Sequence, residues 1–123
     1  MNTIQSSTKH HEFCPLDTTL EILSGKWKSI IICRLMSKDR RFSDLKRTMP
    51  SCTKRMLALQ LNQLEESKIV HRDVFADTVP IKTVYSLTSL GKTLVPIINS
   101  MNNWGSHYIK IRETATTTLH SQN

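Results

Sequence analysis

The sequence has few of the residues that β-rich, loop-rich or membrane-spanning proteins need. Its 123 residues include only 3 Gly, 4 Pro and 6% aromatic residues, which favours a small helix-rich domain over a β-sandwich or a disordered chain. The longest strongly apolar run, residues 30–33, is far shorter than the roughly 20 residues of a membrane helix. The first residues lack the apolar core of a signal peptide, so we expect a cytoplasmic protein without a membrane partner.

Cysteine pairs and catalytic motifs are also missing. The three cysteines are Cys14, Cys33 and Cys52, an odd number without a CxxC pair, which argues against a disulfide framework and a structural zinc site. No GxSxG, Walker-type loop, HExxH or glycine-rich dinucleotide turn occurs, and the ten acidic residues are dispersed. We therefore expect neither an enzyme nor a bound cofactor.

Positive charge is concentrated in one segment. The whole chain has a formal net charge of +7. Residues 26–55 contain ten Lys and Arg and two acidic residues, a net charge of +8, whereas all other residues contain seven basic and eight acidic residues and sum to −1. Such localisation favours a polyanionic partner over a general role of charge in solubility.

Apolar periodicity predicts two helices before residue 38. Thr18 and Glu21 have the spacing of a capping box, which predicts a helix that starts at Thr18. Gly25 is expected to end or bend this helix. A second helix, buried on much of its circumference, is indicated by Trp27, Ile30, Ile31 and Leu35. The segment SKDRR that follows predicts a turn.

Two more helices, separated by a tight turn, come next. Ser43 predicts the cap of a short helix that ends at Pro50, and Thr53 predicts the N-cap of a longer helix. The longer helix has leucines at i, i+4 and i+7, namely Leu57, Leu61 and Leu64. Because these leucines share one face, the opposite face is expected to be exposed, polar and basic at its N-terminal end.

The remaining pattern predicts a hairpin and a last helix. The segments Ile69–Phe75 and Thr83–Leu87 are rich in β-forming residues, and turn residues separate them. Thr88 can cap a helix that Pro96 should kink and that ends near Arg112. We expect a flexible arm over residues 1–13, one domain over 14–112 that includes the last helix (about 88–112), and a flexible tail over 113–123.

This order predicts an α+β, mostly α fold, the winged helix-turn-helix. A short helix, a tight turn, a polar-faced helix and a hairpin follow one another, and in this fold the polar-faced helix lies in the DNA major groove. The alternative is a solvated helix face, but the adjoining cationic segment favours DNA. The residues predicted to contact DNA are Thr53, Lys54, Arg55 and Asn62 on the helix, with Arg40, Arg41, Lys46, Arg47 and Lys82 at phosphates.

A long apolar stripe on the last helix predicts self-association. The stripe exceeds what the core of so small a domain can cover, so part of it is expected to meet a second copy of the chain. The residues predicted for this contact are Leu94, Ile97, Met101, Trp104 and Tyr108.

Several blocks of the sequence resemble the HxlR-type branch of the MarR-like bacterial winged-helix transcription regulators. They are CPLDTTLEILSGKWKSIII, RRFSDLKRTMPSCTKRMLALQLNQLEESKIVHRDV, VPIKTVYSLTSLGKTLVPII and NNWG, which together run from Cys14 to about Gly105. The resemblance implies a homodimer joined by N- and C-terminal dimerisation helices that binds a palindromic operator. Lys68 stands where the family usually has a glycine with positive φ, and this departure predicts strain of up to about 1 kcal/mol.

The resemblance also bears on the cysteines. The cysteine of the CP motif, here Cys14, is a redox sensor in some members of the family, and the helix dipole that follows it would favour a thiolate. The alternative is a half-buried small hydrophobic residue. Cys52 lies just before the predicted reading helix, so a bond from Cys14 to Cys52 across the dimer would shift that helix. Cys33 is predicted to lie in the core.

Two other interpretations remain beside this one. His10, His11 and Cys14 could be read as a metal site, but no further ligand has zinc-type spacing, so we predict no metal. A winged-helix module that binds protein rather than DNA would not need the cationic segment. The sequence is compatible with either an oxidant or a small molecule as the effector.

Overall fold

The computed structural model describes residues 14–122, with side chains up to residue 116. It divides into two compact units, Met1–Lys92 and Thr93–Asn123, which are described separately below. The predicted arm over residues 1–13, with His10 and His11, lies outside the described residues.

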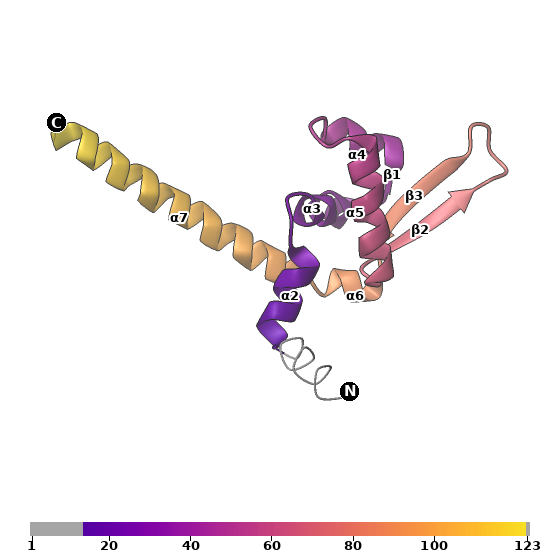
Figure 1. Cartoon of the computed structure of the whole chain (residues 1–123), viewed down its shortest axis with the longest axis horizontal. Helices are drawn as coiled ribbons and strands as arrows, with labels where there is room; N and C mark the ends of the chain where they lie inside the picture. Colours follow the sequence, from indigo (N-terminus) through magenta and orange to yellow (C-terminus); the bar gives the residue numbers. More distant parts are fainter. Residues whose placement is uncertain (1–13, 123) are drawn as a thin grey trace, which may run out of the picture. The chain divides into compact units, whose positions relative to one another are not determined.

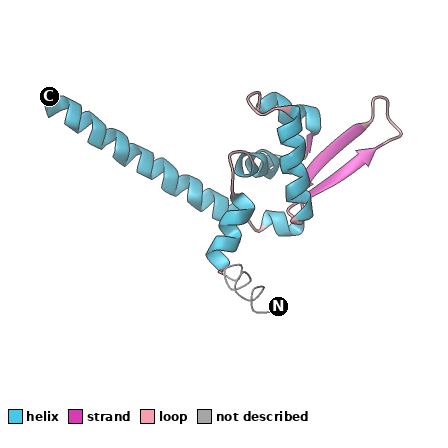
Figure 2. Cartoon of the chain, in the orientation of Figure 1, coloured by secondary structure: helices cyan, strands magenta, loops and turns pink. Residues whose placement is uncertain are grey.

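The first unit has the element order of a winged helix-turn-helix, as predicted. The antiparallel sheet has the strand order β1-β3-β2. The elements, drawn in Figures 1 and 2, are α2 (Pro15–Leu23), α3 (Lys28–Ser37), β1 (Arg40–Arg41), α4 (Phe42–Thr48), α5 (Lys54–Glu66), β2 (Val70–Phe75), β3 (Lys82–Leu87) and α6 (Ser89–Lys92).

The core of this unit is built from the apolar faces of three helices and the sheet. The leucines of α5 at i, i+4 and i+7 are buried, as predicted, and α5 packs against α3 and β2. Each buried leucine or isoleucine contributes roughly 1.5–3 kcal/mol. The fully buried side chains include Ile31, Ile32, Leu45, Leu57, Leu61, Leu64 and Val70.

Two helices begin earlier than the sequence predicted. The helix α2 begins at Pro15 with Cys14 as its N-cap, because proline is preorganised for a first helical position. The predicted start at Thr18 is therefore wrong, and the Thr18 hydroxyl donates instead to the carbonyl of Cys14 at 3.0 Å. The helix α4 begins at Phe42, where the backbone N–H of Arg41 donates to the Asp44 carboxylate at 3.4 Å. The predicted cap at Ser43 is wrong as well.

Residues predicted as a turn form a third strand. Arg40 pairs with Tyr85 and Arg41 with Val84 across β1 and β3. The guanidinium of Arg40 donates to the carbonyl of Arg34 at 3.2 Å, at the C-terminal end of α3. This strand was missed because its pairing partner lies more than forty residues away in the sequence.

The prediction that Cys33 lies in the core is wrong. Ile31 and Leu35 stand four residues apart and define the buried face of α3, which Ile32 widens. At about 100° per residue, Cys33 lies on the other side of the helix from Ile31. Its thiol is exposed.

The hairpin is joined firmly to the end of α5. Strands β2 and β3 pair from Val70 with Leu87 to Phe75 with Lys82, close to the predicted bounds. The hydroxyl of Thr88 donates to the carbonyl of Lys68 at 2.6 Å and accepts from the backbone N–H of Gly91 at 2.9 Å, so Thr88 caps α6 as predicted. A Cβ at position 91 would collide with the carbonyl oxygen of Ile69, which is why a glycine is needed there.

The second unit consists of α7 (Val95–Gln122). The prediction of one kinked helix starting after Thr88 is wrong, because α6 ends at Lys92 and α7 begins at Val95. Pro96 stands in the first turn of α7, where its missing N–H breaks no helical hydrogen bond. The helix continues beyond Arg112 into the segment predicted to be a flexible tail. Within residues 14–122, no helix combines the length and hydropathy of a membrane span.

The C-terminus of α5 generates a stability prediction. Lys68 has φ 67°. The backbone N–H groups of Lys68 and Ile69 donate to the backbone carbonyls of Glu65 and Leu64, respectively, and this pair of hydrogen bonds forms a Schellman cap. Because glycine adopts this φ without steric conflict, Lys68→Gly should raise the free energy of unfolding by up to about 1 kcal/mol in denaturant titrations. Lys68→Ala keeps the Cβ and should give no gain; an equal gain would refute strain as the cause.

Candidate nucleic-acid interface

The helix α5 presents its polar face outward because its leucine face is buried. Thr53 is the N-cap, as predicted, and its hydroxyl accepts from the backbone N–H of Met56 at 3.1 Å. The side chains predicted to reach DNA from this helix, Lys54, Arg55 and Asn62, are exposed. The first turn of α5 therefore combines free backbone N–H groups with two cations, an arrangement that attracts phosphate.

The cations of α4 and β1 differ in how they are used. Arg41 and Arg47 are exposed, and Arg47 pairs with Asp44 at 3.2 Å. Such an exposed pair contributes little stability, so Arg47 can exchange this partner for a phosphate at low cost. Lys46 is half-buried and donates to the carbonyl of Pro50 at 3.3 Å, whereas Arg40 caps α3. Lys46 and Arg40 therefore stabilise the helix-turn-helix through hydrogen bonds to backbone carbonyls, and they also contribute positive charge to it.

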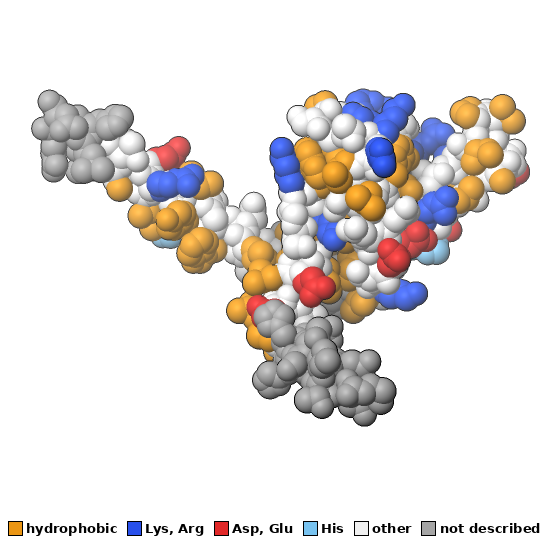
Figure 3. All heavy atoms as spheres, in the orientation of Figure 1, with side chains coloured by type: hydrophobic (Ala, Val, Ile, Leu, Met, Phe, Trp, Pro, Cys, Tyr) orange, Lys and Arg blue, Asp and Glu red, His pale blue; other side chains and the backbone are white. Residues whose placement is uncertain are grey.

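Cationic side chains gather on one part of the first unit. In Figure 3, Lys and Arg side chains cluster over α4 and the start of α5. The distal end of the hairpin is apolar in the same view, with Val79 99% exposed and Ile81 also exposed. The ammonium of Lys82 lies 4.8 Å from the ring centre of Phe75, at the base of that apolar tip.

The turn between α4 and α5 contains a buried thiol. Cys52 is 1% exposed, and its backbone N–H donates to the carbonyl of Met49 at 3.0 Å. Burial raises the pKa of the Cys52 thiol, while the positive charges of Lys46 and Lys26 act in the opposite direction. The thiol is therefore protonated at neutral pH and shielded from reagents. The sequence did not single out Lys26, which lies in the cationic segment but in a turn without periodicity.

The other two thiols are exposed. Cys14 stands at the N-cap of α2 and Cys33 on the outer side of α3. In Figure 1 the start of α2 and the turn between α4 and α5 lie far apart within the first unit. In the described part of the chain, no three His, Cys, Asp or Glu side chains group as metal ligands would.

The apolar stripe of α7 is exposed in the single chain. Ile97, Met101 and Tyr108 are each more than two-fifths exposed, and Trp104 is 69% exposed. The rings of Trp104 and Tyr108 stack with their centres 5.2 Å apart. Leu94, predicted to belong to the same stripe, lies in the turn before α7 and is already buried.

The comparison with known proteins decides the family. Residues 22–113 match the profile of the HxlR-like helix-turn-helix family. This chain belongs to that family. It is 44% identical over 105 residues to YdeP of Bacillus subtilis, described as an uncharacterized HTH-type transcriptional regulator, and the match covers 85% of this chain and 81% of YdeP.

Two solved structures extend this likeness to three dimensions. The redox regulator HypR in its reduced form has a TM-score of 0.77 and 43% identity, and the match covers 81% of this chain and 98% of HypR. The reduced form of the transcriptional regulator YodB from B. subtilis has a TM-score of 0.70 and 32% identity, covering 78% of this chain and 94% of YodB. The HxlR-like protein is thus a DNA-binding transcription regulator rather than an enzyme.

The burial of Cys52 leads to a prediction on thiol reactivity. With a thiol reagent such as dithionitrobenzoate, the two exposed thiols of the HxlR-like protein should react in a fast phase and Cys52 only when the turn opens or the chain unfolds. Cys52→Ala should remove the slow phase and leave the fast phase unchanged. Three equally fast thiols in the folded protein would show that the turn does not protect Cys52.

Proposed function

We propose that the HxlR-like protein regulates transcription as a homodimer that binds a palindromic operator in duplex DNA, with α5 of each copy in the major groove. The observation that carries this proposal is the presentation of Lys54, Arg55 and Asn62 on the exposed side of a helix whose other side is anchored in the core. A rigidly held helix with such side chains can read base edges.

The proposed contacts divide into two kinds. Arg55 would read guanine and Asn62 adenine, because their side chains match the acceptor and donor patterns of these bases. Thr53, Lys54, Arg41, Lys46 and Arg47 would contact phosphates, with Lys82 from the hairpin and Arg40 acting at longer range. Phosphate contacts supply affinity that depends on salt, whereas base contacts supply specificity.

The proposed dimer uses the exposed stripe of α7 together with α2. Ile97, Met101, Trp104 and Tyr108 form an apolar surface without cover in the single chain, and α2 exposes Leu16 and Leu20 four residues apart. Apolar faces of this kind mark protein interfaces. A twofold dimer would space the two α5 helices to match half-sites about one helical turn apart, roughly 10 bp, or a multiple of that.

Substitution of Arg55 tests the reading role of α5. On a duplex selected from random sequence, Arg55→Ala should weaken binding by about tenfold to a hundredfold, because one bidentate contact to a base contributes about 1–3 kcal/mol. Fluorescence anisotropy at several salt concentrations measures the dissociation constant. The wild-type affinity should fall steeply with salt, and the logarithm of the binding constant should change with the logarithm of salt concentration by a slope of about −0.9 per phosphate contacted.

A matched control separates a specific contact from a general loss of charge. Lys92→Ala removes an exposed cation on α6, outside the proposed interface, and should leave affinity nearly unchanged. Equal effects of the two substitutions would argue against a reading role for Arg55. Absence of salt-dependent binding to any duplex would favour the alternative, a module that binds protein.

We also propose that Cys14 senses oxidants. Cys14 is exposed at the start of α2, and the related protein HypR is described as a redox regulator. A bond between Cys14 of one copy and Cys52 of the second would require the turn 49–53 to open, because Cys52 is buried there. That turn carries the N-cap of α5, so oxidation would displace the reading helix.

Diamide treatment tests the redox proposal. Two thiols would lose two protons and two electrons to the azo group of diamide and form a disulfide, which should appear as a covalent dimer on non-reducing gels and should change DNA affinity. Cys14→Ser should abolish the crosslink, whereas Cys33→Ser, which removes the other exposed thiol, should retain it. Retention of the crosslink in Cys52→Ser would exclude Cys52 as the second sulfur.

A further inference from the structure

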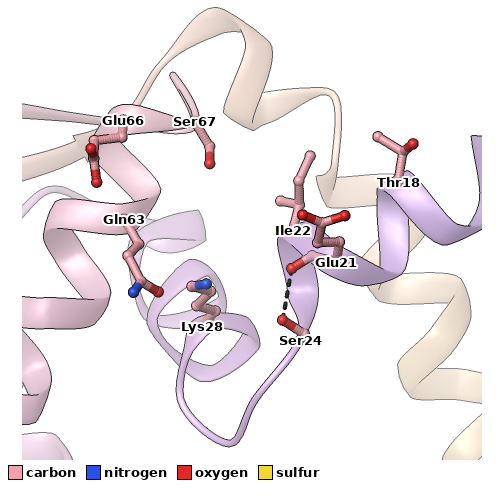
Figure 4. A pocket seen from close by; sticks show the side chains of 8 residues that line it. All are labelled: Thr18, Glu21, Ile22, Ser24, Lys28, Gln63, Glu66 and Ser67. Carbon is pink, nitrogen blue, oxygen red and sulfur yellow. Dashed lines mark hydrogen bonds between the residues drawn. The ribbon is translucent and has the colours of Figure 1, made fainter. Parts of the chain in front are cut away.

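A polar cleft of about 570 Å³ lies between α2, α3 and the C-terminal end of α5. Its volume falls within the range of small-molecule sites in proteins. Figure 4 shows Glu21 of α2 on one side, Gln63 of α5 on the other, and Lys28 of α3 between them, with Ser67 facing the cleft from the end of α5. Two consecutive helices, α2 and α3, and the distant C-terminal end of α5 therefore contribute charged or amide groups to one cleft.

The charged groups of the cleft have no ion-pair partners within the described residues. Glu21 and Glu66 are exposed and Lys28 is half-buried, and none of them forms an ion pair in the part of the chain described. The hydroxyl of Ser24 donates to the backbone carbonyl of Glu21 at 2.7 Å, which ends α2 and leaves the Glu21 carboxylate available. The cleft thus holds separated charges of both signs.

We propose that this cleft binds a small zwitterion of the amino-acid class. An ammonium group of the ligand would lie at the Glu21 carboxylate, and a carboxylate would lie at Lys28 and the Gln63 amide. Charge-assisted hydrogen bonds of this kind are stronger than those between neutral groups. The half-buried Ile22 supplies the apolar contact for a short carbon chain.

The residues of the cleft disfavour other ligand classes. A metal ion would need a group of three or more ligating side chains, and none is present among the described residues. A ligand with only negative charge would face Glu21 and Glu66, and one with only positive charge would face Lys28. A ligand with both charges can pair with Glu21 at one end and with Lys28 at the other.

The position of the cleft links binding to the reading helix. Gln63, Glu66 and Ser67 belong to the C-terminal end of α5 and its cap, while Glu21 belongs to α2. A ligand that bridges them would favour one placement of α5 relative to α2, and it would change the affinity for DNA because DNA binding also depends on the placement of α5. This coupling rests on the proposed function, whereas ligand binding itself does not.

Calorimetry on the full-length protein tests the site. The probes are glycine, γ-aminobutyrate and ε-aminocaproate, which vary the separation of the two charges, with hexylamine and caproate as analogues of one charge. At least one zwitterion should bind at least about tenfold more tightly than either analogue, because it makes a charge-assisted contact at each end. Equal affinity for zwitterion and analogue, or no saturable heat from any probe, would overturn the proposal.

Variants assign the binding to the cleft. Glu21→Gln and Lys28→Met should each weaken binding of the zwitterion by about tenfold or more. Asp17 is an exposed carboxylate on α2 that does not line the cleft, so Asp17→Asn should leave binding of the zwitterion unchanged. Equal loss in Glu21→Gln and Asp17→Asn would refute the assignment.

The link to DNA is measured separately. A saturating zwitterion should change the dissociation constant for the selected duplex by about fivefold or more. If calorimetry shows that the zwitterion binds but DNA affinity does not change, the coupling alone is overturned. If the wild-type protein binds the zwitterion but binds no duplex, the proposed function is refuted and the site is not.

Discussion

The structure depends on one packing contact, the burial of the leucine face of α5 against α3 and β2. Leu57, Leu61 and Leu64 lie in the core, so the rotation of α5 about its own axis is set by the three side chains that must leave water. The base contacts proposed for α5 follow from this rotation. A helix free to roll could not hold Arg55 and Asn62 within reach of particular base edges, since such contacts need a placement accurate to well under the width of a base pair.

Both ends of α5 are tied to other functional elements. At its N-terminal end, the turn that carries the cap Thr53 also contains the buried Cys52, so any chemistry at that sulfur acts on the helix. At its C-terminal end, Lys68 with φ 67° turns the chain toward β2, and Thr88 bonds that turn to the base of α6. The same end forms one wall of the polar cleft. Signals from an oxidant and from a small ligand would thus reach opposite ends of one rigid element.

Local patterns predicted most of the helices, while their boundaries and the third strand were missed. The leucine spacing of α5 and the capping role of Thr53 were predictable because a helix face and a cap depend on residues within one or two turns. The start of α2 was misplaced because Pro15 and Thr18 both have the chemistry of a helix start, and the proline, preorganised for a first helical position, begins the helix earlier. Strand β1 was missed because it exists only through its pairing with β3.

The sequence by itself determined the class of fold, the cationic segment and the polar face of the reading helix, because each of these follows from composition or from the period of a helix. Tertiary structure alone decided which thiols are accessible, which arginines are occupied within the chain, and that Glu21, Lys28 and Gln63 share a cleft. Periodicity tells which face of a helix is buried, but the neighbour across that face is chosen by the long-range packing of the whole unit, and burial, ion pairing and cavities depend on that neighbour.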